Sequence, residues 1–246
     1  MRIGIISDIH ANIEALEAVY RKLRQAGVDQ IYCLGDIVGY GPDPAPCIDF
    51  LIEHEIPSIK GNHDAYASDV EKKLEWNLQE TARTMILWTQ KVLDKAHLDW
   101  LHKLPLQLKV ANVQMVHASM ECLSGEYWPY IIDSNSAQFH FYLQDRRVAF
   151  CGHVHIPLLF SARSGNITMQ VLKNRKLPHK IPAKFLVSVG STGQPRDMDW
   201  RAAAAIYDTE SCVIKNVRVS YDVKAVLNKF KRPGMPKVNP QRIFRG

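Results

Sequence analysis

The chain has 246 residues, of which 46% are hydrophobic, 23% charged and 9% aromatic. A chain of this length buries roughly 70–75% of the surface that it exposes when unfolded, so a stable core needs no disulfide or structural metal. No stretch approaches the ~18 uncharged apolar residues of a membrane span, and the N-terminus lacks the apolar core of a signal peptide. Five scattered cysteines without a CxxC spacing favour a reducing, cytoplasmic setting.

The net charge of +6 is concentrated at the C-terminal end. Residues 223–246 include seven basic and no acidic side chains, and removing these seven from the 31 basic residues leaves 24 against 25 acidic ones. The sequence therefore predicts a nearly neutral domain over 1–222 and a basic, irregular tail over 223–246, where Pro233, Pro236 and Pro240 oppose a helix. The tail either binds a polyanion such as nucleic acid or is a solvent-exposed terminus without a partner.

The first 65 residues alternate between strand and helix patterns. Short apolar segments predict strands at Arg2–Ser7, Ile31–Leu34 and Ile56–Lys60. Between the first two, Asn12 is a suitable N-cap for a helix that ends near Gly27. A second helix carries Ile48, Leu51 and Ile52. Repeated strand–helix–strand units imply parallel strands.

The middle of the chain reads as helical, and the second half is richer in strands. Apolar residues recur at helical spacing from Ala82 to Ala96, and Leu106–Val110 and Val113–Val116 resemble a hairpin. A helix is expected near Asn135–Gln144. The remaining predicted strands are Arg147–Cys151, Leu158–Ala162, Ile167–Leu172, Phe185–Val189, Ala202–Tyr207 and Cys212–Val219. Two sheets flanked by helices would house this pattern in one domain.

Asp, Asn and His side chains follow directly on five of the expected strands. Any one of them alone is an ordinary turn or cap residue. The carboxyl ends of strands line the ligand crevice of open α/β sheets, so we expect these side chains to converge. The blocks are Asp8 and His10; Asp36; Asn62, His63 and Asp64; His117; and His153 and His155.

The side chains in these blocks are oxygen and imidazole donors without thiolates. That set suits Mn, Fe, Zn, Ni or Co. The set holds more donors than the four of one tetrahedral ion and suits two ions that share a carboxylate. Such a pair can clamp a phosphoryl group and convert a bridging water into hydroxide. A histidine that is not a ligand could then protonate the leaving oxygen.

The same blocks, in the same order, resemble the signature of the calcineurin-like metallophosphoesterase superfamily. The resemblance runs from Met1 to Asp208. The stretches SDIHAN, CLGDIVGYGPDP, GNHD, VHAS, GHVH and GSTGQPRD are similar to a bacterial branch related to diadenosine tetraphosphatase and protein phosphatase 2A. The fold implied by this resemblance is α/β, a four-layer α/β/β/α sandwich of two mixed sheets flanked by helices.

The resemblance also implies roles for the matching residues. One metal would be held by Asp8, His10 and His155, and the other by Asn62, His117 and His153. Asp36 would bridge the two ions. His63 would stand near the leaving group, and Asp64 would orient it. The ions would be divalent transition metals, Mn foremost, with Fe, Zn, Ni or Co as alternatives.

Two departures from the family pattern bear on the substrate. Ala11 stands where the family usually has Gly, and it is mildly strained if that position needs a positive φ. No Arg follows Asp36 in Ile37–Tyr40, as it would in a protein Ser/Thr phosphatase. Phosphate contact is therefore expected from Arg196, or from the acid-free stretch Lys173–Lys184 if it folds over the site; the stretch is otherwise a solvated loop.

The expected function is that of a dinuclear phosphoesterase acting on a phosphomonoester or phosphodiester, a nucleotide among them, by attack of the bridging hydroxide. The alternative is a non-catalytic scaffold on the same fold. No heptad or uncovered apolar stripe indicates an oligomeric state.

Overall fold

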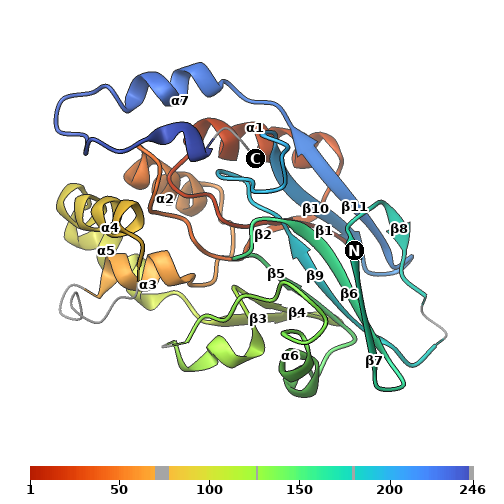
Figure 1. Cartoon of the computed structure of the whole chain (residues 1–246). Helices are drawn as coiled ribbons and strands as arrows, with labels where there is room; N and C mark the ends of the chain where they lie inside the picture. The colour runs from red at the N-terminus through yellow and green to blue at the C-terminus, as the bar shows by residue number, and fades with distance from the viewer. Residues whose placement is uncertain (70–77, 126, 179–180, 244–246) are drawn as a thin grey trace.

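The computed structural model describes residues 1–69, 78–125, 127–178 and 181–243, and it is built around two mixed sheets (Figure 1). The first sheet has the strand order β2-β1-β10-β11-β8, and β1 is parallel to β2. Its strands are β1 Arg2–Ile6, β2 Gln30–Cys33, β8 Arg175–Lys176, β10 Ala202–Asp208 and β11 Val213–Val219. The second sheet has the order β3-β4-β5-β9-β6-β7, with β4, β5 and β9 parallel. Its strands are β3 Gln107–Val110, β4 Val113–Val116, β5 Val148–Cys151, β6 Pro157–Arg163, β7 Asn166–Val171 and β9 Lys184–Val189.

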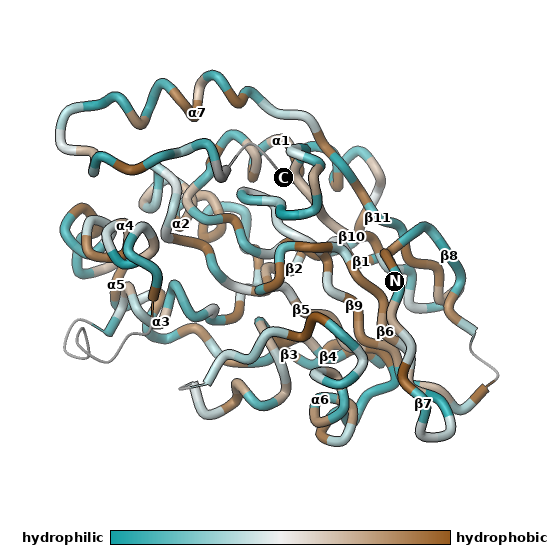
Figure 2. The backbone as a smooth tube through the Cα atoms, in the orientation of Figure 1, coloured by the Kyte–Doolittle hydropathy of each residue, from teal (hydrophilic) through white to brown (hydrophobic). Residues whose placement is uncertain are grey.

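Three apolar layers hold the sheets and helices together. Alternate residues of β1 point to opposite faces, so Ile3 and Ile5 pack against the second sheet while Ile6 packs against helices. Phe150 and Val187 face Ile3 and Ile5 from the second sheet. A third cluster covers the outer face of that sheet. The apolar residues follow the strands (Figure 2), and the expected four-layer α/β/β/α sandwich is confirmed.

The helices lie outside the two sheets. In the described part of the chain they are α1 Ile13–Gln25, α2 Pro44–Glu53, α3 Asn62–Ser68, α4 Glu80–Val92, α5 Lys95–Lys103, α6 Gln138–Leu143 and α7 Val223–Lys229, with 3₁₀ turns η1 Met120–Ser124 and η2 Pro240–Ile243. The predicted cap of α1 is confirmed, since Asn12 accepts a hydrogen bond from the N–H of Ala15 at 3.1 Å. None of the described helices has both the length and the apolar character needed to cross a membrane.

Two predicted elements are wrong. The single helix from Ala82 to Ala96 is two helices, because Leu93 is extended and the Asp94 carboxylate caps α5 through the N–H of His97. The third strand, Ile56–Lys60, forms only one bridge, between Cys33 and Ser58. Pro57 has no N–H to donate to a ladder, so the segment makes little more than that bridge.

The basic tail is not irregular over its first seven residues, because Val223–Lys229 forms α7. Val226 is fully buried, and the Lys229 ammonium lies 2.5 Å from a Glu14 carboxylate oxygen and 2.6 Å from one of Asp43. Arg232 also reaches Asp43, at 3.4 Å. These contacts use part of the tail's positive charge to hold it against α1 and α2. The domain boundary at residue 222 and the binding of nucleic acid stay predictions.

Candidate metal centre

The expected side chains converge at the carboxyl ends of strands from both sheets. Asp8 and Asp36 follow β1 and β2 of the first sheet, whereas His117, His153 and His155 follow β4 and β5 of the second. The two sheets pack face to face, so the ends of their parallel strands meet at one end of the sandwich (Figure 1). The residues of the separate sequence blocks thus form one buried region.

The buried donors form two groups that share one carboxylate. The first group is Asp8, His10, Asp36 and His155, and the second is Asp36, His117 and His153; within each group the donor atoms lie within 4.8 Å of one another. A single Asp36 oxygen, Oδ2, lies 3.7 Å from His10 Nε2 in the first group and 3.4 Å from His117 Nε2 in the second. Asn62 Oδ1 joins the second group at 3.2 Å from His117 Nε2.

Backbone carbonyls fix the orientation of the histidine rings. The Nδ1 atoms of His10, His117 and His155 face carbonyl oxygens, those of Val38, Leu34 and Gln194, at 3.2, 2.7 and 2.6 Å. A carbonyl can only accept, so each Nδ1 carries a proton and Nε2 is the ring nitrogen that faces the cluster. His153 has the opposite arrangement, because its Nε2 donates to the carbonyl of Trp128 at 3.1 Å and its Nδ1 faces the cluster. This pattern of ring nitrogens turned towards the cluster fits a metal centre.

The charges inside the cluster also fit metal binding. Burial alone would raise the pKa of Asp36, but the neighbouring histidines hold it well below its usual value. Burial lowers the pKa of His153 to about 3 and that of His10 well below the usual range. Burial opposes protonation of His117 as well, but the facing Asp36 carboxylate raises its pKa to about 10. A metal ion bound at His117 would have to displace this proton, so binding would release it.

The carboxylates of the cluster pack against glycines that leave no room for a side chain. A Cβ on Gly61 would lie 2.2 Å from Asp36 Oδ1, and one on Gly152 would lie 2.4 Å from Asp8 Oδ2. The backbone strain of the site is visible at Ala11, whose φ of 52° places it in the left-handed region. The strain expected at Ala11 is therefore present.

His63 lies beside the cluster in the first turn of α3. Its peptide N–H donates to Asp36 Oδ1 at 2.8 Å, and its ring lies 4.8 Å from that of His10 and 4.7 Å from that of Tyr40. Its Nδ1 is buried and has no hydrogen-bond partner among the described residues. Burial lowers the pKa of His63 to about 4.

Asp64 contacts backbone, and none of its hydrogen bonds goes to the His63 ring. Its Oδ1 accepts from the N–H groups of Ile37 and Val38 at 2.9 and 3.2 Å, and its Oδ2 accepts from that of Gly61 at 2.9 Å. Burial, followed by the nearby charge of Asp36, raises the pKa of Asp64 to about 7. The orienting role expected of Asp64 therefore has to act through the backbone that carries Asp36 and His63.

Arg196 lies near the cluster, as expected. Its peptide N–H donates to the carbonyl of His155 at 3.2 Å, and its guanidinium donates to Gln194 Oε1 at 3.1 Å. Its charge is one of the smaller causes that lower the pKa of His63, after burial. The position of Arg196 is thus compatible with a contact to a bound phosphate.

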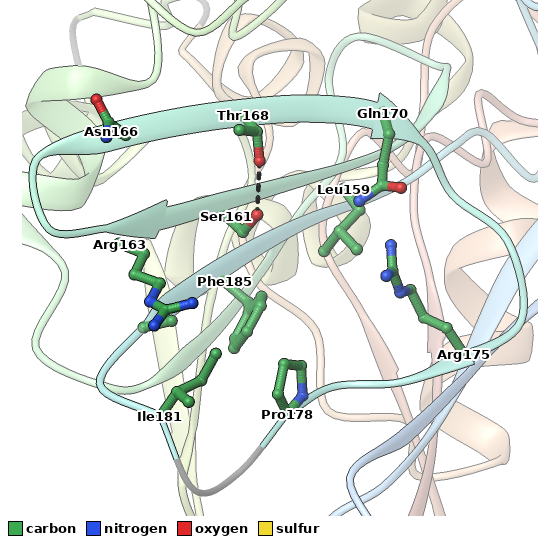
Figure 3. Close-up of a pocket in the computed structure, with 11 residues that line it drawn as sticks. Leu159, Ser161, Arg163, Asn166, Thr168, Gln170, Arg175, Pro178, Ile181 and Phe185 are labelled. Carbon is green, nitrogen blue, oxygen red and sulfur yellow. Dashed lines mark hydrogen bonds between the residues drawn. The ribbon is translucent and has the colours of Figure 1, made fainter.

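The basic stretch Lys173–Lys184 does not fold over the cluster in its described part. Its strand β8 pairs with the start of β11, beside the start of β1 and thus at the far end from Asp8. Figure 3 shows Arg175, Pro178 and Ile181 facing Arg163 and the hairpin of β6 and β7, around a cavity of about 340 Å³. Residues 179–180 lie outside the described residues.

The residues around His153 were not found from the sequence. The backbone carbonyl of Trp128 accepts from His153 Nε2, and the Tyr130 ring stacks on the His153 imidazole with centroids 4.1 Å apart. Both residues lie in a segment rich in aromatic residues, and this composition could have indicated them from the sequence. Tyr40, which flanks His63, stood in a glycine- and proline-rich loop that gave no such signal.

The chain belongs to the calcineurin-like phosphoesterase superfamily, whose domain description matches residues 1–211. It is similar to the crystal structure of a metallophosphoesterase from Sphaerobacter thermophilus, at 33% identity and a TM-score of 0.82, covering 99% of this chain and 98% of that one. The uncharacterized protein MJ0912 of Methanocaldococcus jannaschii is 34% identical over 99% of this chain and 98% of its own.

A third relative is similar over a shorter region. The symmetrical bis(5'-nucleosyl)-tetraphosphatase of Neisseria meningitidis is 30% identical over 137 residues, which are 49% of this chain and 48% of that protein. The predicted superfamily is thus confirmed, and the family supports a phosphoesterase hydrolase.

Proposed function

We propose that the protein is a dinuclear metal-dependent phosphoesterase. The observation that carries this proposal is the position of Asp36, which belongs to both donor groups. Asp8, His10 and His155 would hold one divalent ion, and Asn62, His117 and His153 the other. When bound, the ions would supply Lewis acidity for the phosphoryl group and a water of lowered pKa as the nucleophile. Manganese is the first metal to test, because carboxylate, amide and imidazole donors without thiolates suit it.

His63 is the proposed general acid for the leaving oxygen. It is not a member of either donor group, and its unpartnered Nδ1 leaves it able to exchange a proton. An anionic phosphoryl group bound beside His63 would raise its pKa, because a nearby negative charge favours the imidazolium. Asp64 would position His63 through the backbone, and Arg196 would contact the phosphate.

The proposed substrate is a phosphomonoester or a phosphodiester, nucleotides among them. The chain has no arginine in Ile37–Tyr40, which disfavours a protein phosphatase. The similarity to a dinucleoside tetraphosphatase supports testing nucleotides. A cytoplasmic location is proposed as well, since all five cysteines are free and four are buried.

The test measures bound metal and hydrolysis together. Purified protein is loaded with Mn, Ni, Zn, Mg or Co and assayed on a phosphomonoester, a phosphodiester, a cyclic nucleotide and a dinucleoside polyphosphate. We expect two ions per chain, and Asp36→Asn should lose both ions and activity because it removes the shared ligand. Asp145→Asn, at an exposed ion pair with Lys109, is the matched control. One ion per chain would contradict the dinuclear centre, and two ions without hydrolysis of any substrate would favour a scaffold.

A further inference from the structure

A cavity lined by aromatic rings lies next to the metal centre. It has a volume of about 470 Å³, within the usual range for small-molecule sites, and Tyr127, Trp128, Tyr130 and Phe139 line it. Three of these rings are unusually open to solvent, with exposed fractions of 59% for Tyr127, 51% for Tyr130 and 53% for Phe139. Such a gathering of exposed aromatic side chains marks a binding surface more often than a packing one. We call it the aromatic cavity.

The aromatic cavity is joined to the metal centre through His153. The Trp128 carbonyl accepts the proton of His153 Nε2, and the Tyr130 ring stacks on the imidazole at an interplanar angle of 26°. The wall of the cavity is therefore in direct contact with a member of the second donor group. The aromatic cavity and the second donor group therefore lie on either side of Trp128 and Tyr130, close enough for one substrate to contact both.

The lining of the aromatic cavity suits the organic part of a substrate and not its phosphate. Among the described lining residues, Glu121 is the one charged side chain, and no Lys or Arg is present. A carboxylate repels a second anion, so the phosphate belongs at the donor groups. Asn135 also lines the cavity, and its side-chain amide can hydrogen-bond to the edge of a planar heterocycle.

From these contacts we infer that the aromatic cavity binds a planar aromatic group of the substrate, a nucleobase or an aryl ring. This inference rests on the proposed phosphoesterase function and narrows its substrate class. The faces of Tyr127 and Phe139 would stack on the ring, because base–aromatic stacking tolerates any base and is strong enough to select against an alkyl ester. Substrates without a ring would bind only through their phosphate.

The test uses adenosine, which has the ring but no phosphate to hydrolyse. Ligand-observed NMR on the full chain should detect adenosine binding and no binding of ribose. Tyr127→Ala and Phe139→Ala should each weaken adenosine binding by roughly 5- to 150-fold, the contribution of one base–aromatic stack. Tyr127→Phe keeps the ring and should keep the affinity. Trp200→Ala is the control, since this exposed indole lines a different cavity, with Tyr221.

A second measurement separates this inference from the proposed function. Adenosine should inhibit Mn²⁺-dependent hydrolysis of p-nitrophenyl phosphate or bis(p-nitrophenyl) phosphate competitively, and Tyr127→Ala should relieve the inhibition. The inference would be overturned if adenosine did not bind the wild-type chain. It would also be overturned if adenosine bound Tyr127→Ala and Phe139→Ala as tightly as wild type. Binding that depends on Tyr127, without hydrolysis of these esters or of any substrate named under the proposed function, would leave the aromatic cavity standing and refute the phosphoesterase.

Discussion

Gly61→Ala is expected to damage the metal centre by moving one carboxylate. Gly61 has φ −95° and ψ 175°, an extended conformation that any residue adopts, so the substitution adds no backbone strain. The new Cβ would lie 2.2 Å from Asp36 Oδ1 and 2.3 Å from the Asp36 nitrogen. Ordinary contacts begin at 3.4 Å, so Asp36 or the start of α3 must shift by about 1.2 Å. That shift displaces the carboxylate that both donor groups share.

The expected result is a loss of rate and of metal together. A displacement of about 1 Å at reacting groups can cost about 10²-fold in rate. We therefore expect kcat/KM of the Gly61→Ala enzyme to fall by roughly 10²-fold at fixed Mn²⁺, with fewer than two ions retained per chain after desalting. Overpacking should also lower the free energy of unfolding by about 1–3 kcal/mol.

The control for this prediction is Gly165→Ala. Gly165 lies in the turn between β6 and β7, has a φ of 80°, and an added Cβ would meet nothing within 4 Å. This variant should lose about 1 kcal/mol of stability from backbone strain and keep both ions and full rate. A Gly61→Ala enzyme with two ions and wild-type kcat/KM would refute the argument that close packing against Asp36 fixes the centre.

Three further predictions concern the general acid, pH and the tail. His63→Ala should keep both ions but lose about 10²–10⁴-fold in kcat on an ester with a poor leaving group, and much less on a nitrophenyl ester; equal losses on both would contradict the acid role. Burial lowers the pKa of His140 from 6.5 to about 3. The contribution of neutral His140 to the stability of the fold is therefore complete above pH 6.5 and is lost as the pH falls towards 3. In urea unfolding of the metal-free chain, the free energy of unfolding of His140→Gln should fall by about 2 kcal/mol less than that of wild type between pH 7.5 and pH 5. Parallel pH profiles of the two would exclude this effect of His140. Lys229→Met leaves Asp43 buried with Arg232 as its one remaining cationic partner among the described residues, and should lower the free energy of unfolding by about 1–3 kcal/mol, between the values for surface and buried pairs. Lys231→Met, whose ammonium contacts Asn228 in the described part of the chain, should change it little.

Local patterns predicted the first strand and the first helix of the chain. The strand expected at Arg2–Ser7 and the cap at Asn12 depend on neighbours within a few residues, and both appear as expected. The predictions failed at one local cap, that of Asp94, and at one tertiary contact, that of Val226. Leu93 continues the helical apolar pattern, yet it is extended where α4 ends and α5 begins. Val226 has a place in the core that no local pattern could reveal, and α7 forms in a tail that looked irregular.

The sequence by itself determined the chemistry of the site. The identity of the donors, their positions after strands and the lack of thiolates follow from the order of residues. The family resemblance implied a shared Asp36, and the tertiary structure supplies the physical basis, because the partners of Asp36 in the two donor groups come from two different sheets. The fold likewise sends the basic stretch Lys173–Lys184 to the far end of the sandwich and brings Trp128 and Tyr130 against His153. Side-chain chemistry is a property of the residue, whereas proximity between distant segments depends on how the whole chain packs.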